Sequence, residues 1–153
     1  MNAMFRSRSS PAALPSGAAA LIDALVQTSF ATMAVLNKVA ADHDLSLTQL
    51  RVLAILRDRR VGVTALAEFL GLEKSTMSGL VERAEKRGLL ERTPSENDGR
   101  GVQVSITSEG MKLAERVYAQ VEQSLLPVIN ALGATEGTRL RRLLERMLPT
   151  DAR

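Results

Sequence analysis

Small hydroxyl and basic side chains are concentrated in one segment of the sequence, KSTMSGLVERAEKR, which follows Glu73. Hydroxyl groups can hydrogen-bond phosphates or base edges, basic groups can contact phosphates, and the field of a helix N-terminus also favours phosphate. The residues concerned are Lys74, Ser75, Thr76, Ser78, Arg83 and Lys86. They suggest binding to a nucleic-acid duplex. Taken alone, they fit equally well an exposed helix face that only keeps the protein in solution.

A polar segment further along, PSENDGRG, shifts the balance toward DNA. Asp98-Gly99 favours a tight hairpin turn, and Arg100 at the hairpin tip can enter a narrow minor groove. Asp98 is badly placed against phosphate unless it is paired, so we interpret it as bracing the tip through an ion pair with Arg83 or Arg100. The alternative is that Asp98-Gly99 only closes the turn.

Two helices and a hairpin are predicted to position these residues. A first helix covers about residues 64–70, and Gly71-Leu72 makes the turn into a second helix over about residues 74–87, which a left-handed cap at Gly88 ends. Two strands follow, at 89–93 and 102–106. The apolar stripe of the second helix has the spacing i, i+3, i+4, i+7 and is predicted to be buried. It consists of Met77, Leu80, Val81 and Ala84.

Further helices are predicted on both sides of this module. One covers residues 18–41 with Ser16 as N-cap, and a capping box formed by Ser46 and Gln49 opens the next. Residues 61–63 are a possible edge strand. Thr107 caps a helix that should run to about residue 126, where Pro127 must kink or restart it. A last helix begins near residues 133–136, and its apolar stripe contains Leu140, Leu143, Leu144 and Met147. The outer helices have no core of their own, so we predict a homodimer.

Composition excludes several classes of function. The net charge of +3 and the pI of about 9.8 permit a polyanionic partner without requiring one. Without cysteine there is no disulfide, no thiolate metal site and no sensing by cysteine oxidation, and a cytoplasmic protein fits best. We expect no membrane span and no signal peptide. His43, between Asp42 and Asp44, is interpreted as a loop residue, because three adjacent residues cannot converge on one ion. Neither a metal, nor a cofactor, nor an enzymatic site is expected.

The run LAEFLGLEKSTMSGLVERAEKRGLLERTPSENDGRGVQVSITSEG resembles the winged helix-turn-helix of the MarR family of bacterial transcription regulators. The resemblance extends over about residues 18–148. It implies a dimer whose intertwined terminal helices hold two wings over a pseudo-palindromic operator. It also implies that small anionic or phenolic ligands weaken DNA binding. The chain departs from the family at Gly79, which usually is a longer polar residue, and at Ala84, which usually is a larger aliphatic one.

The predicted fold is therefore mainly α with a small β-hairpin wing, in a MarR-like intertwined dimer. We assign 1–16 to a flexible tail, 17–45 and 108–148 to the dimerisation region, 46–107 to the winged helix-turn-helix, and 149–153 to a C-terminal tail. The predicted function is a sequence-specific repressor relieved by a small aromatic or anionic ligand. The hypothetical ligand pocket contains Phe30, Met33, Leu50 and Leu53, each of which equally fits ordinary core. The alternative is an effector-independent winged-helix module that binds a protein or organises DNA without sequence preference.

Overall fold

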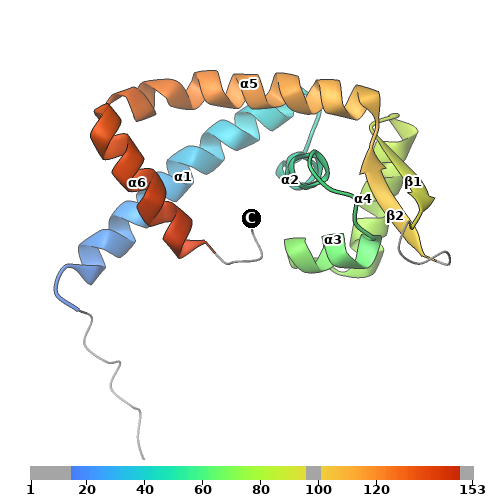
Figure 1. Ribbon diagram of the computed structural model, residues 1–153, viewed down its shortest axis with the longest axis horizontal. Coiled ribbons are helices and arrows are strands. Elements are labelled where there is room, and N and C mark those ends of the chain that lie inside the picture. The colour runs from blue at the N-terminus through green and yellow to red at the C-terminus, as the bar shows by residue number, and fades with distance from the viewer. Residues whose placement is uncertain (1–14, 96–100, 149–153) are drawn as a thin grey trace, which may run out of the picture. The chain divides into compact units, whose positions relative to one another are not determined.

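The computed structural model of the protein describes residues 15–95 and 101–148, and these ranges contain six helices and two strands (Figure 1). The helices are α1 (Ala18–Asp42), α2 (Leu47–Leu56), α3 (Val63–Leu70), α4 (Lys74–Lys86), α5 (Ser108–Asn130) and α6 (Ala134–Met147). The strands are β1 (Leu90–Pro94) and β2 (Val102–Ile106). The prediction of a mainly helical fold with a small β-hairpin is confirmed. The intertwined dimer stays a prediction.

The chain forms two compact units whose boundary lies inside α1. The first unit ends at Ala34 and contains the N-terminal part of α1. The second begins at Val35 and contains the end of α1 and all the other elements. The predicted DNA-binding residues in the described ranges all belong to this second unit.

Local signals in the sequence account for the start of α2 and the turn between α3 and α4. Ser46 Oγ accepts a hydrogen bond from the Gln49 amide at 3.1 Å, and Gln49 Oε1 accepts one from the Ser46 amide at 2.8 Å, so the predicted capping box is confirmed. Helix α3 ends at Gly71, whose φ of +64° lies in the left-handed region that glycine adopts without steric strain. This sharp end turns the chain directly into α4.

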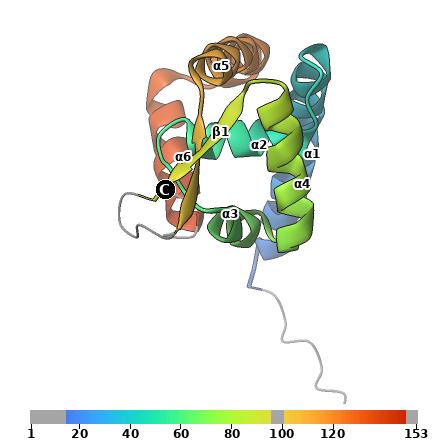
Figure 2. The ribbon, with the colours of Figure 1, turned by 90° about the vertical axis from the view of Figure 1, so that its right-hand side faces the viewer.

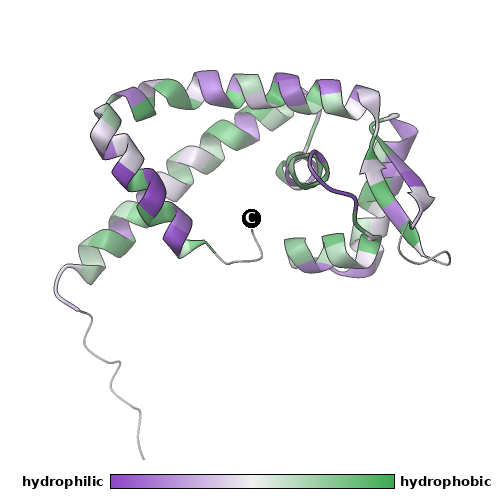
Figure 3. Ribbon diagram, in the orientation of Figure 1, coloured by the Kyte–Doolittle hydropathy of each residue, from purple (hydrophilic) through white to green (hydrophobic). Residues whose placement is uncertain are grey.

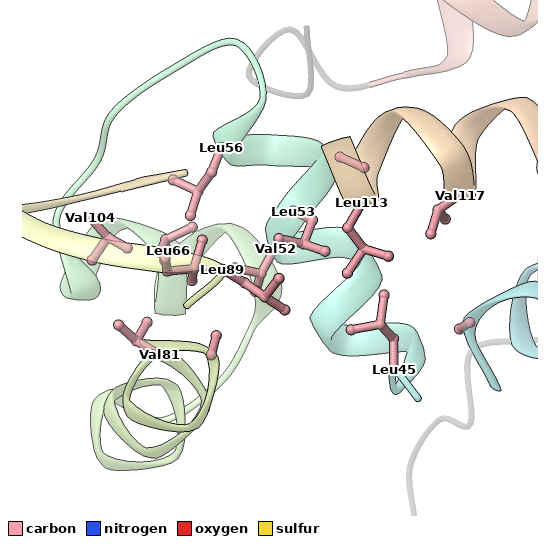
Figure 4. Close-up of a cluster of buried hydrophobic side chains, with 14 of the residues drawn as sticks. Leu45, Val52, Leu53, Leu56, Leu66, Val81, Leu89, Val104, Leu113 and Val117 are labelled. Carbon is pink, nitrogen blue, oxygen red and sulfur yellow. The ribbon is translucent and has the colours of Figure 1, made fainter. Parts of the chain in front are cut away.

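The core of the second unit is built from residues of α2, α3, α4 and the hairpin, together with residues from the end of α1 and from α5. Figure 2 shows how α2, α3, α4 and the strands are arranged. Leu66 of α3, Val81 of α4 and Val104 of β2 are fully buried. Figure 4 shows these side chains close to one another and to Leu56 of α2. Burying each such side chain contributes about 1.5–3 kcal/mol to folding. The core therefore fixes α4 against the rest of its own chain.

The hairpin pairs β1 with β2 in antiparallel register, from Leu90 opposite Ile106 to Pro94 opposite Val102. Val61 forms an isolated bridge to Val104, with backbone hydrogen bonds of 2.8 and 3.3 Å. The possible edge strand at residues 61–63 is thus a single bridging residue. It pairs with the middle of β2, on the edge away from β1.

Two predictions at helix ends are wrong. Helix α1 begins at Ala18 directly after Gly17, whose φ is +83°, so Ser16 lies too far back to be the N-cap. Helix α5 runs without a break through Pro127 to Asn130. A proline removes one backbone donor and costs about 3 kcal/mol in a helix interior. The helix nevertheless continues, so the predicted end or restart near residue 126 is wrong.

Large apolar side chains are exposed on the outer helices of the single chain, where Figure 3 shows hydrophobic residues recurring. They include Leu21, Ile22, Leu25, Val26, Phe30 and Met33 of α1, Leu126, Val128 and Ile129 of α5, and Leu140, Leu143, Leu144 and Met147 of α6. In the described ranges, α1 is the one helix long and apolar enough to cross a membrane by length and composition alone. This is weak evidence for a span, because a helix that buries an apolar face against protein meets the same criterion.

Candidate nucleic-acid interface

Helix α4 has one face in the core and one face toward solvent. Met77, Val81 and Ala84 are buried and Leu80 is half-buried, which confirms the predicted apolar stripe. The predicted DNA-binding residues lie away from it. Lys74, Ser75, Thr76, Arg83 and Lys86 are exposed, and Ser78 is half-buried. The structure therefore places all six on one helix whose position the core fixes.

The N-terminal end of α4 has no side-chain cap. Its N-cap residue is Glu73, in extended conformation, and no side chain accepts a hydrogen bond from the first turn. Backbone donors at a helix start are unpaired within the helix and attract anions. Ser75 and Thr76 lie in this same first turn. This end of α4 consequently combines backbone and hydroxyl donors in a form that suits a phosphate or a base edge.

Further along α4, a charged side chain lies beside Gly79. A Cβ atom added at Gly79 would lie 3.5 Å from Nη1 of Arg83, so the Arg83 guanidinium lies back along the helix beside Gly79. One turn later, Lys86 Nζ lies 2.9 Å from Glu82 Oε1. The hydrogen bond and the charge of Lys86 lower the pKa of Glu82. The solvent face of α4 thus has hydroxyls at its start and paired charges toward its end.

The hairpin is attached to α4 by an ion pair and is closed near its tip. Arg92 Nη1 of β1 lies 3.0 Å from Glu85 Oε2 of α4. The Ser95 amide donates to the Gly101 carbonyl at 2.9 Å, and Gln103 Nε2 donates to Ser95 Oγ at 3.0 Å. The predicted tip residues Asp98 and Arg100 lie outside the described residues, so their roles stay predictions.

A mainly apolar cavity lies beside α2, within the second unit. Its volume is about 210 Å³, and it is lined by Leu36 from the end of α1, by Leu50, Leu53, Ala54 and Arg57 from α2 and its C-terminus, and by Ala114, Val117, Tyr118 and Val121 from α5. Two of the four predicted pocket residues, Leu50 and Leu53, line it. The other two, Phe30 and Met33, are exposed residues of the first unit, and their role in a pocket stays a prediction.

The sequence analysis missed the polar part of this cavity. The Arg57 guanidinium carbon lies 5.1 Å from the centre of the Tyr118 ring, a cation–π contact at the rim. A signal for Arg57 exists in the sequence, because Leu50, Leu53 and Arg57 follow one another at the spacing of one helix face. Tyr118 is the only tyrosine of the chain, but no sequence pattern connects it with α2.

No group of three or more metal-ligating side chains occurs among residues 15–95 and 101–148. His43 instead contacts Gln120 of α5, with 2.8 Å between Nε2 and Oε1. The titratable groups of this part of the chain thus form pairs and short networks rather than a metal site.

Comparison with known proteins places this geometry in a group of regulators. A family model described as the MarR family matches residues 43–101. The HTH-type transcriptional regulator PecS of Dickeya dadantii is 31% identical over 116 residues, which cover 73% of this chain and 70% of that protein. The homoprotocatechuate degradative operon repressor of Escherichia coli is 28% identical over 126 residues, which cover 82% and 85%. The crystal structure of apo MarR from Escherichia coli aligns with a TM-score of 0.68 and 28% identity, covering 91% of this chain and all of that one.

Proposed function

The chain belongs to the MarR family of DNA-binding transcriptional regulators, and from this premise we propose that it is a homodimeric repressor of a pseudo-palindromic operator. It is a regulator and not an enzyme. The observation that carries the proposal is the solvent face of α4, where hydroxyl and basic side chains project from a helix fixed by the core. Because its proposed target is DNA, we place the protein in the cytoplasm.

We assign the DNA contacts of α4 by side-chain chemistry. Ser75, Thr76 and Ser78 contact base edges in the major groove or nearby phosphates. The basic residues Lys74, Arg83 and Lys86 contact phosphates, which gives affinity without sequence preference. In the wing, Arg100 enters the minor groove and Asp98 braces it. These contacts make residues 46–107 the DNA-binding region.

The partner proposed for the outer helices is a second copy of the chain. Residues 17–45 and 108–148 contain the exposed apolar side chains of α1, α5 and α6. Apolar patches larger than a few hundred Å² are rare on monomeric proteins and mark interaction sites. A symmetric dimer would cover these faces and present two copies of α4 to successive major grooves.

The proposed effector site is the cavity beside α2. Its lining is apolar apart from the Arg57 guanidinium, which lies over the Tyr118 ring. An arginine pairs with a carboxylate through a planar fork, and an aromatic ring stacks on tyrosine. We therefore propose a small aromatic acid as the ligand. In support, one relative is named as the repressor of a homoprotocatechuate degradative operon.

One selection experiment tests the repressor assignment. Duplexes bound by the purified protein are selected from random DNA, and their affinity is compared with that of unselected duplex at the same salt concentration. A specific repressor should prefer its selected site by about a thousandfold or more. Equal affinity for both would contradict the proposal and would favour a module that binds DNA without sequence preference. Repeating the selection with aromatic acids tests the effector.

A further inference from the structure

The corner where α1 ends and α2 begins holds the end of α4. Asp44 in this corner has a φ of +54°, and the carbonyls of His43 and Asp44 both accept from Arg87, the C-cap residue of α4. Arg87 Nη1 lies 2.7 Å from the Asp44 oxygen, and Nη2 lies 3.4 Å from the His43 oxygen. A guanidinium presents its donors in a rigid planar fork, so these bonds fix direction as well as distance.

The same corner is connected to α5. Gln120 Nε2 donates to Asp42 Oδ2 at 2.8 Å, and Gln120 Oε1 lies 2.8 Å from His43 Nε2. The Asp42 carboxylate only accepts hydrogen bonds, so it orients the Gln120 amide with its oxygen toward His43. His43 must then donate from Nε2. The corner is thus held by side-chain hydrogen bonds to α5 as well as by the Arg87 fork.

A second attachment holds the end of α4 from another side. Thr107, the N-cap of α5, donates from Oγ1 to the Gly88 carbonyl at 2.6 Å, and its amide donates to the Leu89 carbonyl at 3.0 Å. In addition to its buried stripe, the end of α4 is held at two points, by Thr107 and by the Arg87 fork. Without the Arg87 fork, α4 would be freer to tilt on its core contacts. Over the 13 residues of α4, a swing of about 10° would move the far end by about 3 Å. That is larger than the tolerance of a hydrogen bond.

We propose that Arg87 is a positioning residue for DNA binding, which fixes the direction of α4 by holding the corner between α1 and α2. This inference rests on the proposed function, because the start of α4 must meet base edges at a set spacing in two half-sites. In this scheme Arg87 acts through the corner carbonyls that accept from its Nη1 and Nη2, and not through a contact with DNA.

The test compares Arg87→Ala with Arg83→Ala, a matched removal of an arginine proposed to contact phosphate. Arg87→Ala should weaken binding to the selected operator about tenfold and leave the slope of log affinity against log salt unchanged. Reselection should return the same half-sites at more varied spacings. Arg83→Ala should instead lower the salt slope by about one. Arg87→Lys, which keeps the charge but has a single donor nitrogen in place of the planar fork, should recover part of the affinity.

A DNA-free measurement separates this inference from the proposed function. The chain has no cysteine, so spin labels can be placed at Thr76→Cys on α4 and Glu115→Cys on α5, with the labelled protein diluted into unlabelled protein. Arg87→Ala should broaden the distance distribution between the labels, and Arg83→Ala should not. An unchanged width, or a salt slope reduced by about one in Arg87→Ala, overturns the inference. Absence of specific DNA binding by the unmodified protein would contradict the repressor assignment instead, while the label distances would still decide the role of Arg87.

Discussion

Helices α4 and α6 carry the same apolar spacing, yet the single chain buries only one of them. Met77 and Val81 of α4 are 0% exposed and Ala84 is 7% exposed. The four residues of the α6 stripe are 39–57% exposed, and no residue of α6 is buried. The α6 stripe consists of Leu140, Leu143, Leu144 and Met147. The difference therefore lies in what covers the two stripes.

The comparison teaches that periodicity identifies an apolar face but not the protein that covers it. Helix α4 follows α3 after the tight turn at Gly71 and precedes a hairpin, so its own neighbours in sequence cover its stripe. Helix α6 follows the 23-residue α5 and contributes nothing to the core. Its stripe is left for another surface, which we propose to be a second copy of the chain.

The largest effect is expected from a charge in the buried stripe. Val81→Asp should lower the free energy of unfolding by more than about 4 kcal/mol, because it buries a carboxylate without a partner. Denaturant titration followed by circular dichroism measures this loss. Glu82→Gln, one residue away on the exposed face, is the control and should change stability by no more than about 0.5 kcal/mol. Similar stability of Val81→Asp and the parent protein would refute the proposed core.

The next largest effect is expected where α5 begins against the end of α4. A Cβ atom at Gly110 would lie only 2.1 Å from the Leu89 carbonyl oxygen. Gly110→Ala should therefore destabilise the protein by about 3 kcal/mol, since backbone has to move. Gly137→Ala in α6 is the matched control, because an added Cβ meets nothing within 4 Å there. If both variants unfold at the same temperature, the close approach at Gly110 is wrong.

A charge in the α6 stripe should show most clearly how α6 differs from α4. Leu144→Asp should weaken the proposed dimer about a hundredfold, equal to about 2.7 kcal/mol, while the DNA-binding region stays folded. Sedimentation velocity over a range of protein concentrations measures the association. A circular dichroism spectrum that matches the spectrum of the parent protein shows that the fold is kept. Arg142→Ala on the same helix is the control. Unfolding of Leu144→Asp without dissociation would mean that the chain itself covers the stripe.

The smallest effect is expected on the solvent face of α4. Gly79→Ala should stabilise the protein by up to about 1 kcal/mol, because alanine favours helix and its Cβ would lie at an ordinary contact distance of 3.5 Å from Arg83 Nη1. The melting temperature measures this gain. Reselection from random DNA should return an altered half-site, because the groove now meets a methyl group. A lower melting temperature would contradict the geometry beside Arg83.

Features encoded by neighbouring residues were predictable from the sequence, and contacts between distant residues were not. The capping box at Ser46, the cap at Thr107 and the left-handed Gly88 each depend on a few adjacent residues. The family resemblance predicts the DNA-binding role of α4 from its sequence, and that role stays a prediction. The Arg87 fork joins residues 43 positions apart, and no local pattern indicates it. At Pro127 the sequence rule placed the helix end near residue 126, whereas α5 continues to Asn130.

The start of α4 differs from the starts of α2 and α5. In α2 and α5 a serine or threonine side chain at the N-cap accepts a hydrogen bond from the first turn. At α4 the corresponding position holds Glu73, which accepts nothing from the first turn. In the unbound protein water must satisfy those amides. When a duplex docks, one of its phosphates can take the place that a serine oxygen has in α2. The DNA phosphate would then act as the N-cap of α4, the helix proposed to contact the bases. Hydrogen exchange of the amides in the first turn of α4 should therefore slow when DNA binds.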